Sequence, residues 1–224
     1  MIDSIPVDYS GSLLSREFIE KNCATIFPVR KKTRTLYGLF LELIRQLYSD
    51  QNNLLTGTSA VWNKDELLSK IWIDTEYVWE DNTPEFRPAI YISLQGLKPT
   101  PIIGQKSQIG SDTKEGEAHY GKTINGSVAF VHIGGTKGET INLIDNTYEY
   151  LDGLADIIRQ DFCFDTFGVV DVTPLKVVKA EKDHLRGEVV AAFSYKDYWT
   201  IKLESPKLKR IVLSTGQSLI DMVH

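Results

Sequence analysis

Residues 188–204 read EVVAAFSYKDYWTIKLE, and this stretch decides the fold of the C-terminal half of the chain. Its odd positions are apolar apart from Asp197, and its even positions are mostly polar. Because successive side chains of a strand point to opposite faces, the alternation predicts a half-buried strand. A two-residue hairpin at Lys196 and Asp197 would mix the two sets of side chains, so we expect one continuous strand with a bulge at Asp197.

The predicted strand is long enough to overhang the core that it helps to build. A strand over residues 188–204 would span roughly 56 Å at about 3.3 Å per residue, whereas common strands have about five or six residues. An overhanging apolar strand needs a partner that covers it, so we expect a neighbouring subunit to bury it. The predicted subunit interface comprises four residues of this strand and two lysines of a preceding loop: Tyr198, Trp199, Ile201, Leu203, Lys106 and Lys114.

That preceding loop is the longest segment without a periodic pattern. Residues 96–126 hold six glycines and two prolines and show neither a period of 2 nor one of 3.6. We therefore expect residues 97–126 to form a long loop. Such a loop is uncommon inside a compact domain, so it is expected to be functional, mobile, or ordered only against another molecule.

Three segments have the signals of helices. Residues 35–50 carry apolar side chains at helical spacing and predict an amphipathic helix. A second, short helix is expected to begin near Asn63, whose side chain would cap it. Residues 142–162 have an apolar stripe opposite a row of acids, and they predict one long helix with Asn142 and Asp145 in a capping arrangement.

Segments rich in β-branched and aromatic residues predict the remaining strands, at residues 71–79, 89–94, 127–133, 169–172 and 175–180. The sequence thus predicts a single α+β domain over residues 1–224. A mainly antiparallel sheet packed by one long helix would form the core at residues 86–215. Residues 1–85 would add a helical N-terminal layer to that core.

Composition and charge exclude several classes of function. The chain has 224 residues, enough to bury a core without disulfides or a metal. No apolar run approaches the roughly 20 residues that span a bilayer, so we expect no membrane segment. The net charge of −5 disfavours a general nucleic-acid binder. Acids stand where a signal peptide has bases, so we expect synthesis in the cytoplasm.

The residues that most often carry chemistry do not form a recognisable site. The four histidines have no metal-ligand spacing, and no nucleophile or nucleotide-binding motif is present. Cys23 and Cys163 lie in apolar surroundings, where buried thiols are expected. The basic cluster at residues 30–34 is expected to be a solvated helix entry. We therefore expect no enzyme, no cofactor and no metal.

The tryptophans leave one alternative open. Together with the β-rich half of the chain, Trp62, Trp72, Trp79 and Trp199 would suit a carbohydrate or small-ligand binding module. Aromatic residues at strand positions more often belong to a core. A binding module is therefore the rival of a structural subunit.

Four segments resemble one family of virion proteins. They are RPAIYISLQG at residues 87–96, NGSVAFVHI at 125–133, INLIDNTYEYLDGLADIIRQDF at 141–162 and EVVAAFSYKDYWTIKLES at 188–205. Their order is similar to that of the tail terminator and head–tail joining proteins of tailed phages. The resemblance covers about the last 140 residues, and the N-terminal layer departs from the short members of that family.

The resemblance implies a structural role in the virion without catalytic residues. It implies a homo-oligomeric ring, with six copies expected, at the neck of the particle. Such a ring would cap the tail tube and bind the tail tube protein and the head-side connector protein, while DNA would only pass through its lumen. Another head–tail connector or tail subunit of the same kind is the alternative within this class.

Overall fold

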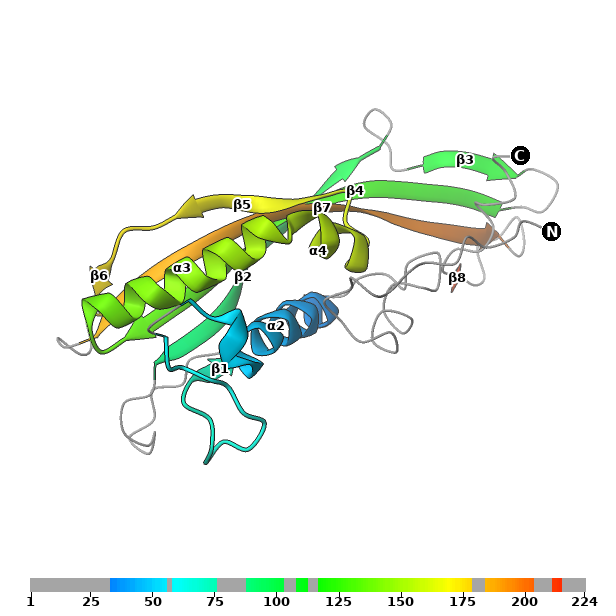
Figure 1. Ribbon diagram of the computed structural model, residues 1–224. Helices are drawn as coiled ribbons and strands as arrows, with labels where there is room; N and C mark the ends of the chain where they lie inside the picture. Colours follow the sequence, from blue (N-terminus) through cyan, green and yellow to red (C-terminus); the bar gives the residue numbers. More distant parts are fainter. Residues whose placement is uncertain are drawn as a thin grey trace.

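One mixed sheet forms the centre of the fold, with the strand order β1-β2-β4-β7-β5 (Figure 1). The computed structural model describes residues 33–55, 58–75, 88–102, 108–112, 117–178, 184–203 and 211–214. The strands are β1 (Trp72–Asp74), β2 (Ala89–Pro101), β3 (Gln108–Asp112), β4 (Glu117–Gly134), β5 (Thr166–Val172), β6 (Lys176–Val177), β7 (Leu185–Leu203) and β8 (Ile211–Ser214). β1 is parallel to β2, whereas β3 pairs antiparallel with β4, and β6 and β8 pair antiparallel with β7. Helices pack on one face, so the predicted α+β class is confirmed.

The long C-terminal strand is present as predicted, without the expected bulge. β7 runs unbroken from Leu185 to Leu203 and is antiparallel to β4 along its length. The pairing with β4 has no register shift at Asp197, which stands opposite Lys122. The polar residue that interrupts the alternation is therefore accommodated by a charged partner and not by a bulge.

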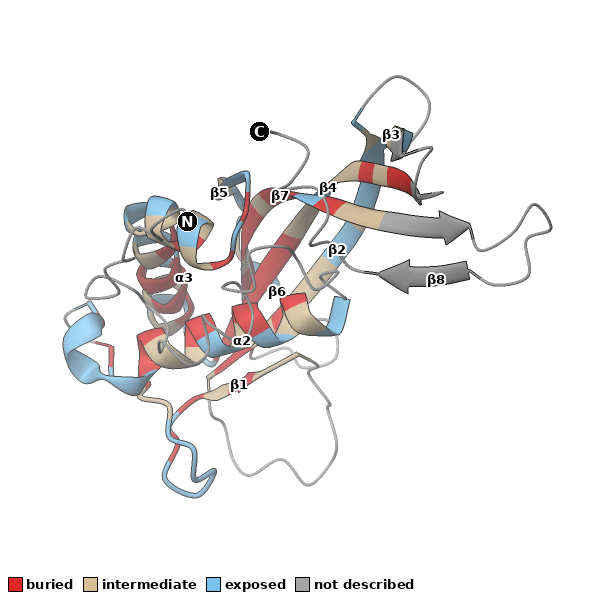
Figure 2. Cartoon of the chain, turned by 90° about the vertical axis from the view of Figure 1, so that its right-hand side faces the viewer, coloured by how far each residue is buried: buried red, intermediate tan, exposed pale blue. Residues whose placement is uncertain are grey.

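The prediction of a long loop at residues 97–126 is wrong. β2 continues to Pro101, β3 lies within the segment, and β4 already begins at Glu117. Beyond Leu94 most positions of β2 are exposed, so its sequence shows no alternation (Figure 2). The prolines fit because, among the described strands, only β1 pairs with that side of β2, and it does so only from Ala89 to Tyr91. A strand edge tolerates a missing N–H group.

The helices differ from the predictions at their ends. α2 (Thr33–Ser49) confirms the N-terminal helix and is followed by a short 3-10 turn, η1 (Gln51–Asn53). The expected helix at residues 142–162 begins earlier and is divided at Leu154 into α3 (Lys137–Gly153) and α4 (Ala155–Asp161). Thr136, and not Asn142, caps it: the Thr136 hydroxyl accepts the Glu139 N–H at 3.2 Å, and the Glu139 carboxylate accepts the Gly135 N–H at 2.8 Å.

The second short helix near Asn63 is also wrong, because a turn replaces it. The Asn63 side chain accepts the N–H of Asp65 at 2.9 Å, and the Asp65 side chain accepts the N–H of Leu67 at 3.0 Å. These residues are the expected capping types, but their side chains close successive turns of the backbone instead.

The other strand predictions are confirmed in part. β1 covers three residues of the predicted strand at 71–79, and residues 76–87 lie outside the described part. β5 contains the strand expected at 169–172 and begins three residues earlier, at Thr166. β6 covers two residues of 175–180, of which 179 and 180 are outside the described residues.

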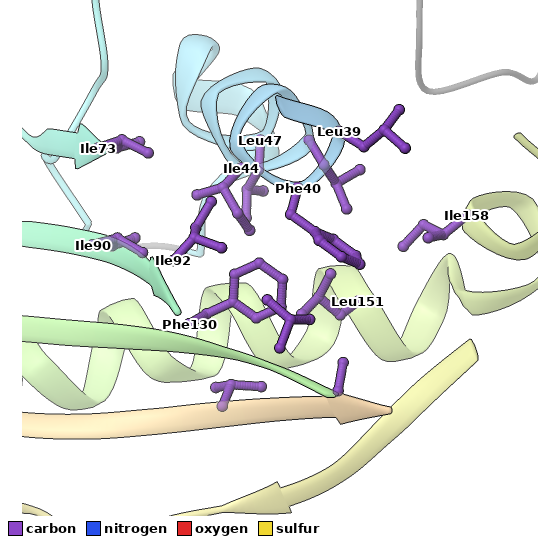
Figure 3. Packing of buried hydrophobic residues seen from close by; sticks show 14 of the residues in the cluster. Leu39, Phe40, Ile44, Leu47, Ile73, Ile90, Ile92, Phe130, Leu151 and Ile158 are labelled. Atoms are coloured by element: carbon purple, nitrogen blue, oxygen red, sulfur yellow. The ribbon is translucent and has the colours of Figure 1, made fainter. Parts of the chain in front are cut away.

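The main core lies between the sheet and the helices (Figure 3). Phe40 of α2 is fully buried and meets the rings of five phenylalanines from β4, β5, β7 and the end of α4: Phe130, Phe162, Phe164, Phe167 and Phe193. Apolar residues from α2, β1, β2, β4 and α3 pack into the same cluster. The helix of the predicted N-terminal layer therefore contributes to the core of the sheet.

Candidate functional sites

The sheet extends beyond the helices as an arm. We define the arm as Lys196 to Leu203 of β7, the paired stretch Glu117 to Thr123 of β4, and the attached strands β3 and β8. None of the described helices covers these strands in Figure 1. The arm differs from the predicted single overhanging strand, because β4 pairs with β7 as far as Lys202 and β8 pairs with the other side of β7 from Thr200 to Leu203.

An aromatic and charged cluster lies on one face of the arm. Trp199 stacks on Tyr120, with ring centroids 5.5 Å apart and an interplanar angle of 10°. Lys122 lies 5.3 Å from the centroid of the Trp199 ring and 3.6 Å from a carboxylate oxygen of Asp197. Paired residues of antiparallel strands share a face, so these four side chains form one group. Both aromatic rings remain half-buried.

Tyr198 lies on the opposite face of the arm from Trp199, because the two residues are consecutive in a strand. Its ring covers Gly121, where an added Cβ atom would come within 2.7 Å of it. Trp199 and Tyr198, two residues of the predicted subunit interface, therefore lie on opposite faces of the arm. Ile201 and Leu203 pair with Leu213 and Ile211 of β8, and their side chains are outside the described part. Lys106 and Lys114 lie outside the described residues.

A cleft of about 420 Å³ lies between α2, the turn at residues 62–69 and β1. Its walls include the side chains of Glu42, Arg45, Trp62, Lys64, Trp72 and Asp74. The structure thus brings Trp62 and Trp72 to one site, whereas Trp199 is in the arm and Trp79 is outside the described residues. The alternation of side chains along β1 explains the position of Trp72. Ile73 points into the core, so its neighbours Trp72 and Asp74 point to the other face of the strand.

Arg45 is fixed in the cleft by two contacts. Its Nη2 donates to the carbonyl oxygen of Ile73 at 3.0 Å, and its guanidinium lies 5.1 Å from the centre of the Trp62 ring. Tryptophan is the best aromatic partner for a guanidinium group. The arginine and the indole therefore hold each other in position and join α2 to the turn.

A buried polar network lies between α2, α3 and β4. The Tyr48 hydroxyl donates to the carbonyl oxygen of Leu143 at 3.0 Å and lies 3.3 Å from the Thr147 hydroxyl. His132 Nε2 lies 2.8 Å from the same Thr147 hydroxyl. Burial lowers the pKa of His132 to about 3, so the imidazole is neutral near pH 7. Since Tyr48, Thr147 and His132 are all inaccessible to solvent, this network joins helices to sheet and has no route to a substrate.

The thiol expected to be buried at Cys163 is exposed. Phe162 and Phe164 on either side of it are buried, and Cys163 itself has a positive φ of 52°. The apolar neighbours thus fill the core, while the cysteine between them turns outward. Cys23 and His224 are outside the described residues.

The described residues contain no group of three or more histidines, cysteines and acids that could hold a metal ion. Within the same residues no helix is long and apolar enough to cross a membrane. No protein-family model matches the chain, and no curated protein matches it.

Proposed function

We propose that this chain is a structural subunit of a tailed phage, a ring-forming tail terminator at the neck that caps the tail tube and joins it to the head connector. The observation that supports the proposal best is the arm, a sheet extension outside the helical layer with half-buried aromatic rings on its surface. An arm of this kind offers a second subunit a surface that is distant from the core.

The chemistry of the arm suits a contact between subunits. Aromatic residues are enriched at protein interfaces, and a tryptophan beside a lysine combines apolar area with a polar rim. The arm and the opposite edge of the sheet are different surfaces, so a contact between them is heterologous, and repeated contacts of that type close into a ring when the rotation permits. The resemblance to tail terminators supplies the expected six copies.

The decisive measurement is the assembly state of the native chain and of two Trp199 variants. We expect closed rings of the native protein in mass photometry and negative-stain microscopy at micromolar concentration. Trp199→Asp places a charge in the contact and should give a folded monomer, while Trp199→Phe keeps an aromatic ring over Tyr120 and should still assemble. Circular dichroism separates loss of assembly from loss of fold.

Two results contradict the proposal. A native chain that stays monomeric, together with particles that contain no ring of it, would exclude a ring-forming neck protein. Rings that form equally well from Trp199→Asp would show that the arm face is not the contact.

A further inference from the structure

The cleft between α2 and β1 has a preformed polar and aromatic lining. The turn beside it is closed by the side chains of Asn63 and Asp65, and the buried Ser69 hydroxyl donates to the carbonyl oxygen of Ile71 at 2.7 Å. Arg45 is held by Ile73 and Trp62. A ligand therefore meets groups that are already positioned, which reduces the entropy lost on binding.

Two indoles supply the apolar part of this lining. Trp62 and Trp72 line the same cleft and are both half-buried. The face of an indole carries partial negative charge, so it attracts the weakly positive C–H groups on the flat side of a sugar ring. The volume of about 420 Å³ is within the usual range of small-ligand sites, about 300–1,000 Å³.

The charges around the indoles indicate an uncharged ligand. The carboxylates of Glu42, Glu66 and Asp74 share the cleft with the cations of Arg45 and Lys64. A phosphate or another anion would meet three carboxylates, and a cation would meet Arg45, which is fixed in place. Hydroxyl groups instead both donate to carboxylates and accept from cations, so a polyhydroxylated ligand can use both kinds of group.

From these observations we propose that the cleft is a binding site for a neutral saccharide of pyranose units. The sugar packs on Trp72 and Trp62, and its hydroxyls bond to Glu42, Asp74 and Lys64 at the mouth. This site is separate from the arm: β1 is separated from β7 in the sheet by β2 and β4. The proposal therefore does not depend on ring formation.

The test is titration of the full chain with three neutral probes, maltotriose, cellotriose and N,N′,N″-triacetylchitotriose, in which binding is measured by saturation-transfer NMR and calorimetry. We expect at least one probe to bind with a Kd on the order of 1 mM or tighter. Trp72→Ala should weaken that binding at least about tenfold, because it removes one of the two indoles. Trp199→Ala is the matched control, since it removes a tryptophan from the arm and should leave the Kd unchanged.

Glu42→Gln gives an independent variant if Trp72→Ala does not fold. Glu42 is exposed on α2, so the fold should tolerate the change, and we expect a several-fold weaker Kd from the loss of a charged acceptor. Absence of saturation transfer from all three probes at about 10 mM, far above the expected Kd, overturns the proposal. Equal binding by the native chain and by the folded cleft variant overturns it as well.

Discussion

Replacing Phe40 with alanine tests whether α2 is an integral part of the core. Phe40 is fully buried, and its ring centroid lies 5.4 Å from that of Phe193, 5.8 Å from Phe162 and 5.9 Å from Phe130. Truncating a buried phenylalanine costs about 3–5 kcal/mol through lost burial and the cavity left behind. The number of ring neighbours around Phe40 places the expected cost in the upper part of that range.

Urea unfolding followed by circular dichroism measures this cost. With m of about 2.5 kcal/mol/M, a loss of about 4.5 kcal/mol lowers the urea midpoint by about 1.8 M. Phe40→Leu fills most of the cavity and should cost less, about 1–2 kcal/mol. Glu42→Ala, two residues away on the exposed side of the same helix, should change stability by no more than about 0.5 kcal/mol.

The reasoning is refuted if Phe40→Ala destabilises the chain by less than about 1 kcal/mol, close to the effect of Glu42→Ala. That result would mean that α2 rests on a core which is complete without it. A shift in the midpoint shared by all unfolding probes would instead show that helix and sheet unfold together.

Three further substitutions have expected outcomes in the same unfolding assay. Gly38→Ala should stabilise the chain by about 0.5–1 kcal/mol, because Gly38 is in α2 with nothing within 4 Å of an added Cβ atom. Gly126→Ala should destabilise it by about 1–3 kcal/mol, since that Cβ would lie 2.7 Å from both Leu97 and Phe193; a neutral result would contradict the packing. The folded-state pKa of His132 is depressed to about 3, so the unfolded chain binds the proton first. Stability from neutral His132 is therefore complete above about pH 6.5 and is lost as pH falls towards 3. Between pH 7 and pH 5 the free energy of unfolding should fall less steeply for His132→Gln than for the native chain. Equal slopes for the two proteins would contradict a neutral, buried His132.

The elements that could be predicted from the sequence are those with one buried face. α2 buries residues at helical spacing and β7 buries odd positions from Val189 to Asp197, so each pattern reports its secondary structure directly. Asp197 was the exception in that pattern, and it is buried beside Lys122, with 4% of its surface exposed. A strand was therefore predicted correctly, whereas its partner across the sheet could not be identified from one strand alone.

The extension of β2 and β4 could not be predicted for a related reason. Their distal residues gain order from pairing with each other and with β7. Most of β2 beyond Leu94 is exposed, whereas Ala118 and His119 of β4 are both buried although they point to opposite faces, so neither stretch shows a regular alternation. The six glycines of residues 96–126 also favour the interpretation of this segment as a loop, which is wrong. Gly121 and Gly126 were counted as loop formers, but they lie within β4, where the rings of Tyr198 and Phe193 cover them.

The cleft had a partial signal in the sequence. Trp62 and Trp72 were recognised as aromatic candidates, but spacing alone did not show that a turn at residues 63–69 would bring them to one wall. The helical periodicity of residues 35–50 places Arg45 on the polar side of α2 and indicates no contact for it. Its role depends on the carbonyl oxygen of Ile73, a contact between segments 28 residues apart in the chain.

No described helix covers the arm, so its stability must come from strand pairing and from contacts between its own side chains. Within the arm β7 pairs with β4 on one side, and with β8 on the other side from Thr200 to Leu203, while the buried carboxylate of Asp197 is paired with Lys122. Stacking between Tyr120 and Trp199 adds about 0.5–1.5 kcal/mol, far less than the burial of a core phenylalanine. The arm should therefore open at a lower free energy than the part of the sheet under α3. In the ring that we propose, a second subunit covering Trp199 would bind the closed arm and so raise the free energy of this opening.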